Sequence, residues 1–409
     1  MNIESKVLKN GLKIYAVNLN DNSSVASVNI FYKVGSSYEE LGKSGIAHLL
    51  EHLSFKSTKT HKAGEFDEII KALGGVNNAC TSFDYTQYYV NIANIHIKRV
   101  LELYSSMMSE LLFNKDEFYK ERDVVLEEER LRVGNDAFGY LYNAIYNYAF
   151  IKTSYHWTPI GFADDIANLT PKIVKEFYTK FYAPNNACIV ISGDLANIDI
   201  FSMCEEIFSK KSAKKITQNK VYEPDRTGLK EIELSFPNLN SNIFACAYKI
   251  PAFNHEDFEY LKAISIFLNL DKNSIIKNKM INEYNLCADL DFYAQSSKNE
   301  NLFIIFGVCN DLVNTKSAIK QLKKLINQTK FNKFDTRTIY NQLELSINQV
   351  KSNPSALASG IGKFECFGDV NVFLNSLTSK ELDYKILNQV FKKYLKDDNL
   401  TQIILKEKV

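Results

Sequence analysis

Residues 45–56 read GIAHLLEHLSFK and contain the motif His48-Leu-Leu-Glu51-His52. On an α-helix, residues four apart share a face, so His48 and His52 can present ring nitrogens to one point. The apolar residues of the stretch fall on the opposite side, at the spacing of a helix with one buried face: Ile46, Leu49, Leu50 and Leu53. The stretch therefore predicts a helix that turns both imidazoles, with Glu51 beside them, away from the core.

Two neutral imidazoles at this separation suit a first-row metal ion, and zinc most of all. The alternative is a pair of histidines on a solvated helix face. The chain has only six histidines, and a glutamate stands between these two, so we favour the metal site.

A catalytic zinc site needs a third protein ligand and an open position. The candidates lie in residues 121–130, ERDVVLEEER, whose alternative reading is an acidic solvated helix. Glu121 and Glu128 are seven residues apart and share one stripe of a helix, whereas Glu127 and Glu129 point about 100° to either side. A carboxylate beside the apolar Val124–Val125 pair needs a cation, which favours Glu128 as ligand and Glu121 as a supporting carboxylate.

The composition is that of an ordinary globular protein, with 45% hydrophobic and 24% charged residues among 409. The net charge of +1 gives no reason to expect nucleic-acid or membrane binding. Seven scattered cysteines favour reduced thiols and argue against a disulfide framework. The N-terminus lacks the apolar core of a signal peptide, and no apolar run reaches the roughly 18 residues of a membrane span. We expect a cytoplasmic protein.

The first half of the chain alternates strand and helix patterns. Residues 5–34 predict strands joined by turns, residues 61–75 a second helix, and residues 77–93 two further strands. A long helical zone at 97–132 is broken near Phe113, and the run ACIVISGD at 187–194 predicts a buried strand.

Residues 210–227 are basic and polar, contain a proline, and predict a linker. After them the order of elements starts again, without a second His-x-x-Glu-His motif. We expect an α+β fold with two homologous domains of about 200 residues, at 1–209 and 228–409, each a mainly antiparallel sheet packed by helices. Any metal chemistry belongs to the first domain.

The His-x-x-Glu-His motif resembles that of the inverzincins, and the chain resembles the pitrilysin/insulinase family of zinc metallopeptidases. It is most similar to small members such as the mitochondrial processing peptidase β subunit. Glu128 lies 76 residues after His52, and Glu121 lies seven before Glu128; both spacings match the family's glutamates. The segments GGVNNACTSFDYTQYY at 74–89 and FYAPNNACIVISGD at 181–194 also resemble family segments.

The resemblance implies one zinc ion per chain, held by His48, His52 and Glu128, with Glu51 as the general base and Glu121 assisting the site. It also implies that Asn78, Ala79, Cys80 and Thr81 form an edge strand to which an extended peptide substrate adds as a further strand. The family fold further implies that one chain forms half of a peptidase chamber.

One family feature is missing from the second half. Family members often carry an arginine and a tyrosine there, and the nearest match in this chain places Ile281 and Ala288 at those positions. Chains of this size in the family usually pair, so we expect a homodimer, with a heterodimer containing a metal-free relative as the alternative.

Two functions remain in competition. The first is a zinc endopeptidase that acts on short or unfolded peptides. The second is a non-catalytic core or scaffold subunit of a larger complex that retains a metal site. Relatives of the second kind typically have eroded motifs, whereas all four site residues are present here, which favours the enzyme.

Overall fold

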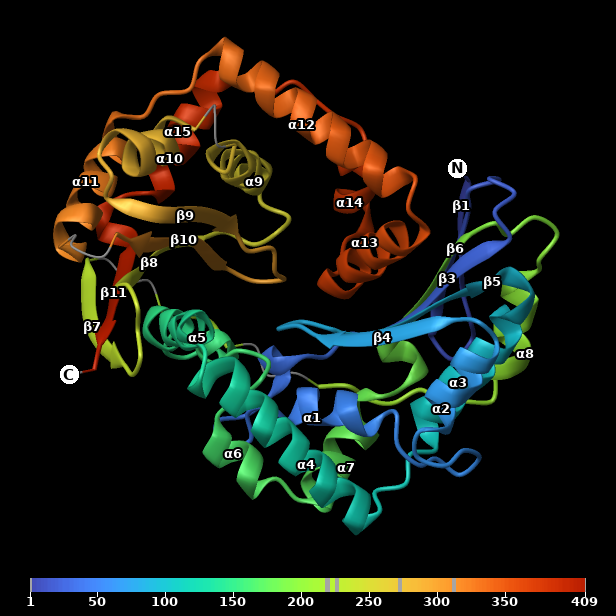
Figure 1. Cartoon of the computed structure of the whole chain (residues 1–409). Helices are drawn as coiled ribbons and strands as arrows, with labels where there is room; N and C mark the ends of the chain where they lie inside the picture. Colours follow the sequence, from blue (N-terminus) through green and yellow to red (C-terminus); the bar gives the residue numbers. More distant parts are fainter. Residues whose placement is uncertain (1, 218–220, 225–227, 271–273, 311–313, 409) are drawn as a thin grey trace. The chain divides into compact units, whose positions relative to one another are not determined.

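The computed structural model of the chain describes residues 2–217, 221–224, 228–270, 274–310 and 314–408. These residues form two compact units (Figure 1). Unit 1 is drawn from 1–130, 157–220 and 348–377, and unit 2 from 131–156, 221–347 and 378–409. Each unit therefore includes a segment from the opposite half of the sequence.

The expected boundaries 1–209, 210–227 and 228–409 concern the two homologous halves and stay a prediction. Residues 218–220 and 225–227 of the expected linker lie outside the described residues.

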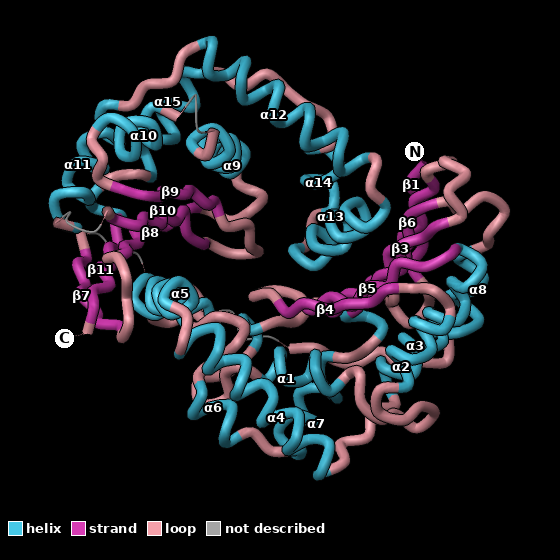
Figure 2. Tube along the Cα trace, in the orientation of Figure 1, coloured by secondary structure: helices cyan, strands magenta, loops and turns pink. Residues whose placement is uncertain are grey.

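Unit 1 is built on a six-stranded sheet in the order β1-β2-β6-β3-β5-β4 (Figure 2). Neighbouring strands pair antiparallel except for β2 and β6, which are parallel. The strands are β1 Asn2–Val7, β2 Lys13–Asn18, β3 Val25–Tyr32, β4 Val76–Thr81, β5 Thr86–Ala93 and β6 Ala187–Gly193. β4 lies at one edge of this sheet.

Helices cover both faces of the unit 1 sheet. They are α1 Ile46–Leu53, α2 Glu65–Ala72, α3 Ile97–Ser109, α4 Lys115–Glu129, α6 Ala163–Asn168, α7 Pro171–Phe181, α8 Ile200–Phe208, α13 Pro354–Phe367 and α14 Val370–Ser376. One face carries a core shared by the strands with α1, α3, α7 and α8. The other face packs against α13. Every residue of β6 is buried because the strand is covered on both sides.

Helix α13 comes from the C-terminal half but fits closely onto the unit 1 sheet. Its Leu357 and Ile361 join Phe31 of β3 in one apolar cluster. A side chain at Gly362 would lie 2.0 Å from the Phe31 ring, so only glycine allows this approach. The Glu365 carboxylate, almost buried, lies 2.8 Å from Lys33 Nζ.

Unit 2 is built on a five-stranded sheet in the order β7-β11-β8-β10-β9. The strands are β7 Lys230–Phe236, β8 Ile243–Ile250, β9 Cys287–Ala294, β10 Asn301–Cys309 and β11 Leu400–Glu407. The helices are α5 Ala137–Ala149, α9 Glu256–Leu268, α10 Ile275–Asn278, α11 Thr315–Gln328, α12 Lys333–Lys351 and α15 Tyr384–Tyr394, of which α12 ends in unit 1. Helices α9, α11 and α15 share the main core, and α5 contacts β8 and β11.

The two sheets repeat one topology. The order β2-β6-β3-β5-β4 in unit 1 corresponds to β7-β11-β8-β10-β9 in unit 2, and in both the first pair is parallel. The predicted fold class, two similar α+β domains with mainly antiparallel sheets, is confirmed. The predicted break near Phe113 is also confirmed, because α3 ends at Ser109 and α4 begins at Lys115.

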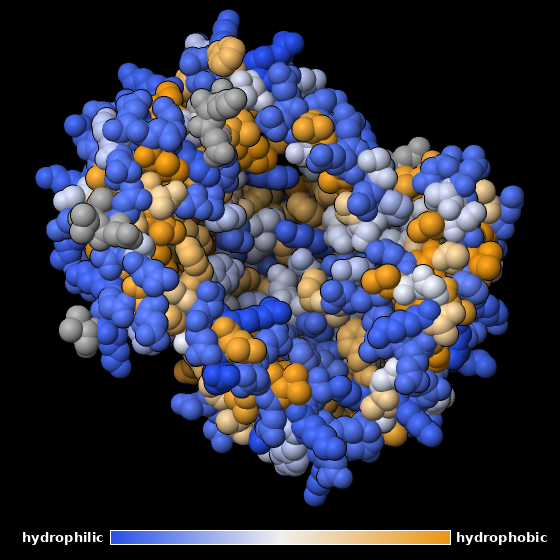
Figure 3. All heavy atoms as spheres, in the orientation of Figure 1, coloured by the Kyte–Doolittle hydropathy of each residue, from blue (hydrophilic) through white to orange (hydrophobic). Residues whose placement is uncertain are grey.

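Most described atoms on the face drawn in Figure 3 belong to hydrophilic residues, with hydrophobic residues scattered among them. None of the helices in the described part of the chain combines the length and apolar character needed to cross a bilayer.

Candidate metal centre

Helix α1 forms as the sequence predicts, with one buried apolar face. Ile46, Leu49 and Leu50 are almost fully buried, whereas the side chains of His48 and His52 keep 12% and 21% of their exposure. The helix follows Gly45, whose φ of +82° is a left-handed conformation that favours glycine. Gly45 has no side chain with which to cap the helix, so the cap must come from elsewhere.

Glu39 supplies that cap from the preceding loop. Its buried carboxylate accepts hydrogen bonds from the N–H of Gly45 at 3.0 Å and of Ala47 at 2.8 Å. It also accepts from Trp157 Nε1 at 2.8 Å. Burial raises the pKa of Glu39 to about 8, although the three N–H donors favour the charged form and so act to lower the pKa. A carboxylate at a helix N-terminus fixes where the helix begins, so Glu39 positions the motif.

Helix α4 brings the third candidate ligand to α1. Glu128 Oε2 lies 3.3 Å from His52 Nε2 and 3.7 Å from His48 Nε2. One ligand atom from each of the three residues lies within 4.8 Å of the others. Zinc bonds of about 2.0–2.1 Å at tetrahedral angles separate neighbouring donors by about 3.3 Å. Two imidazoles and one carboxylate at these distances could hold zinc and leave a fourth position open.

Glu121 lies on the other side of His52. Its Oε1 is 3.0 Å from His52 Nδ1, and its Oε2 is 2.7 Å from Lys56 Nζ. Hydrogen bonding through Nδ1 leaves His52 Nε2 directed toward Glu128. Burial lowers the pKa of His52, but the hydrogen bonds to Glu121 and Glu128 outweigh it and raise the value to about 9. Without a metal, these carboxylates therefore favour a protonated His52.

Glu51 is held by a residue of the edge strand. Thr81 Oγ1 donates a hydrogen bond of 2.6 Å to Glu51 Oε2. Only 9% of the Glu51 surface is exposed, so this hydrogen bond fixes the direction of a largely buried carboxylate. Thr81 thus fixes a carboxylate on the same helix that carries His48 and His52.

The structure places Asn78, Ala79, Cys80 and Thr81 in β4, at the edge of the sheet of unit 1. β4 pairs with β5 on one side, with Ala79 opposite Tyr88. Its residues alternate between exposed and half-buried. An edge strand with this pattern can accept another strand.

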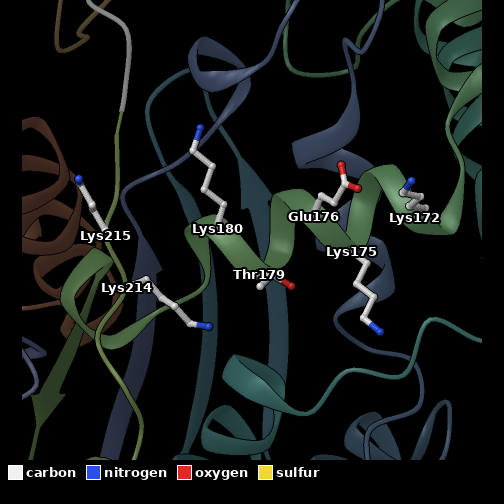
Figure 4. A pocket seen from close by; sticks show the side chains of 7 residues that line it. All are labelled: Lys172, Lys175, Glu176, Thr179, Lys180, Lys214 and Lys215. Atoms are coloured by element: carbon white, nitrogen blue, oxygen red, sulfur yellow. The ribbon is translucent and has the colours of Figure 1, made fainter.

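Unit 1 also contains a hollow of about 520 Å³ between α7 and the segment around Lys214. It is lined by Lys172, Lys175, Glu176, Thr179, Lys180, Lys214 and Lys215. Figure 4 shows that the ammonium groups point in different directions and do not converge on one point. The hollow thus lacks the converging donors of the His48 cluster.

Two family descriptions match the chain. "Insulinase (Peptidase family M16)" matches residues 15–155, and "Peptidase M16 inactive domain" matches residues 168–343. The chain belongs to the insulinase family, peptidase family M16. Within this M16 chain, the two matches agree with the single His-x-x-Glu-His motif, which lies in the first half.

Named relatives support the assignment. "Zinc protease PqqE" of Helicobacter pylori is 36% identical over 98% of this chain and 92% of its own length. A protein of Arabidopsis thaliana named "Probable mitochondrial-processing peptidase subunit beta, mitochondrial" is 23% identical over 87% of this chain and 69% of its own length. The family resemblance seen in the sequence is therefore confirmed.

Solved structures agree with the fold. The crystal structure of a protease from Helicobacter pylori matches with a TM-score of 0.95 and 33% identity over 99% of both chains. The periplasmic protease PqqL from Escherichia coli matches with a TM-score of 0.80 and 19% identity, over 98% of this chain and 47% of that one. The second likeness concerns the fold alone.

One cluster contains all five residues that the sequence predicts for the site, namely His48, Glu51, His52, Glu121 and Glu128. Three neighbours of the site were not predicted from the sequence: Lys56, Glu39 and Trp157. Lys56 lies four residues after His52, but α1 ends at Leu53, so Lys56 belongs to the turn after the helix and helical spacing does not place it. Glu39 and Trp157 had no signal in the sequence, because the loop geometry that joins them to α1 leaves no periodic pattern.

Proposed function

We propose that this chain is a zinc-dependent endopeptidase that hydrolyses peptides or unfolded segments bound as an added β-strand. The observation that carries the proposal is the convergence of His48 and His52 from α1 with Glu128 from α4, all within 4.8 Å. Two imidazoles and one carboxylate are the protein donors of a catalytic zinc site, which keeps its fourth coordination position open.

Zinc, when bound by these residues, supplies Lewis-acid polarisation of the peptide carbonyl and acidifies a water molecule. Glu51 accepts a proton from the attacking water and later delivers it to the leaving amine. The Thr81 hydroxyl keeps the Glu51 carboxylate in position for both transfers. Glu121 holds the His52 ring through Nδ1, which keeps Nε2 available as a ligand atom.

The peptide adds to the exposed edge of β4, residues 78–81. Main-chain hydrogen bonds to this edge supply affinity without regard to sequence, and side-chain pockets supply preference. Ile281 and Ala288, the nearest match to the family's arginine and tyrosine, offer a substrate neither a charge nor a hydroxyl. We propose that the chain acts as a homodimer, and measurement of the native mass of the purified protein tests this against a heterodimer.

The test of the function compares wild type with Glu51→Gln for zinc content and for cleavage of a quenched peptide library. We expect both proteins to bind one zinc ion and only wild type to cleave. Glu128→Gln should lose zinc, whereas Glu127→Gln should retain it, because the adjacent Glu127 pairs with Arg130 on an exposed face.

Three outcomes would contradict the proposal. Cleavage unaffected by Glu51→Gln would refute the general base. Zinc retained at full affinity in Glu128→Gln would refute the third ligand. Zinc binding by wild type without cleavage of any library peptide would favour the scaffold alternative, which the second-half match to an inactive domain also accommodates.

A further inference from the structure

Unit 2 contains a small hollow on the edge of its sheet, here called the acid–aromatic hollow. Its volume is about 130 Å³. It is lined by residues from α5, β9 and β10, chiefly Phe138, Asp289, Asp291, Tyr293, Phe306 and Val308. Two carboxylates and three aromatic rings thus line one cavity at an edge strand.

Strand alternation places these side chains on one face. In β9, Asp289, Asp291 and Tyr293 point away from the core, whereas Leu290 and Phe292 are buried in it. The neighbouring strand β10 continues the face, because Phe306 is the register partner of Asp291 and Val308 that of Asp289. The set is therefore fixed by a paired sheet rather than by a loop.

The aromatic rings form the apolar part of the hollow. The Phe306 ring centroid lies 6.5 Å from that of Phe138 and 6.2 Å from that of Tyr293, both at steep angles. Phe138 and Tyr293 remain 45% and 44% exposed, which leaves ring surface in contact with water. The faces of such rings attract cations, most strongly when water is displaced.

The charge of the hollow is negative. Lys277 Nζ lies 3.3 Å from Asp291 Oδ1 and 3.8 Å from Asp289 Oδ1, and so balances one of the two carboxylates. Tyr293 OH donates a long hydrogen bond of 3.4 Å to Asp291 Oδ2. One net negative charge beside exposed ring faces suits a cationic group with an apolar stem, which is how arginine and lysine side chains are built.

We propose that the acid–aromatic hollow binds an arginine or lysine side chain of a peptide. The proposal rests on the proposed function and deepens it, because it assigns unit 2 a part in choosing the substrate. An apolar side chain could fill the same volume, but it would leave the carboxylates without a role in recognition.

The test measures peptide binding by fluorescence anisotropy with the Glu51→Gln variant, so that cleavage does not interfere. The probes are labelled nine-residue glycine–alanine peptides in which one arginine is moved through every position, beside the same set with norleucine. At one or two neighbouring positions we expect arginine to bind about fivefold more tightly than norleucine. Elsewhere the two sets should bind alike.

Three further substitutions and one control, made in the same background, decide where that preference arises. Asp291→Asn should bring the arginine-to-norleucine ratio close to one, whereas the matched control Asp398→Asn, an exposed acid of unit 2, should leave it unchanged. Phe138→Leu should also reduce the ratio. Lys277→Met should raise it, because it removes the ammonium that competes for both carboxylates. A purely structural role would not produce opposite effects.

The proposal is overturned if no position prefers arginine, or if Asp291→Asn and Asp398→Asn have the same ratio. Its failure is distinguishable from failure of the proposed function. A retained arginine preference without cleavage by wild type would refute the peptidase and support the hollow. Cleavage of peptides by wild type without any arginine preference would support the peptidase and refute binding by the hollow.

Discussion

Replacing Glu121 by glutamine tests how the metal centre is held together. Glu121 Oε1 lies 3.0 Å from His52 Nδ1 and Oε2 lies 2.7 Å from Lys56 Nζ. The Glu121 side chain is only 11% exposed, so solvent screens these contacts weakly. Glutamine keeps an acceptor for His52 but removes the negative charge that both partners share.

The expected loss of zinc affinity follows from the position of Glu121 behind a ligand. A carboxylate that orients a metal-binding histidine typically contributes a factor of about 10–100 in affinity, or about 1.4–2.7 kcal/mol. Glu121→Gln also leaves the Lys56 ammonium without its ion pair near the metal. We therefore expect zinc to bind about 30-fold more weakly at pH 9.

The deficit should shrink at lower pH. In the metal-free wild type, the pKa of His52 is raised to about 9, so a proton competes with zinc at pH 7. Without the Glu121 charge this pKa falls, and the proton competes less in the variant. The ratio of dissociation constants, variant to wild type, should therefore be smaller at pH 7 than at pH 9.

The assay is competition for zinc against a chromophoric chelator at pH 7 and pH 9. Lys56→Met is the matched control, because it removes the other end of the ion pair and leaves the bond between Glu121 and His52 in place. We expect it to bind zinc no more weakly than wild type. Equal affinities of Glu121→Gln and wild type at pH 9 would refute the reasoning, as would an equal loss in Lys56→Met.

Three further predictions concern the residues around the site and the sheet. Thr81→Val should reduce kcat about tenfold with zinc retained, because it removes the hydrogen bond from Thr81 Oγ1 to the Glu51 carboxylate. Unchanged peptide cleavage would contradict this. Glu39→Ala should lower the free energy of unfolding, measured in urea, by about 3 kcal/mol, and it should weaken zinc binding. An unchanged stability together with an unchanged zinc affinity would refute the capping role of Glu39. Glu365→Gln should lower the free energy of unfolding by about 2 kcal/mol, because Lys33 loses the carboxylate with which it pairs. Burial raises the pKa of Glu365, but the hydrogen bonds and charges of its lysine and tyrosine partners outweigh burial and lower the pKa. The stabilisation of the fold by ionised Glu365 is therefore present above the unfolded pKa of about 4.3, and it is lost as the pH falls through the folded pKa. Urea unfolding from pH 7 to 3 should thus show a smaller acid loss in Glu365→Gln than in wild type, and parallel curves would contradict it.

Much of the fold could be predicted because its signals are local. The spacing of apolar residues predicted α1, the Thr, Tyr and Val content of residues 77–93 predicted two strands, and the repeat of this order predicted two similar units. The candidate site followed from the same rules: two histidines four apart and two glutamates seven apart are each brought together by one helix. The pairing of α1 with α4 came from the family spacing, not from periodicity.

The sequence by itself determined that the motif at residues 48–52 lies on a helix, which face of that helix carries the ligands, and that one half alone has the metal motif. Only the tertiary structure decided that Glu39 and Trp157 anchor the start of α1, and that Thr81 holds Glu51. It also decided that α13 packs on the sheet of unit 1, where Glu365 lies 2.8 Å from Lys33, 332 positions away in the chain. Local sequence patterns indicate which face of one helix or strand is exposed to solvent and which face is buried. Contacts between distant elements depend on how the sheets and helices pack, which leaves no period in the sequence.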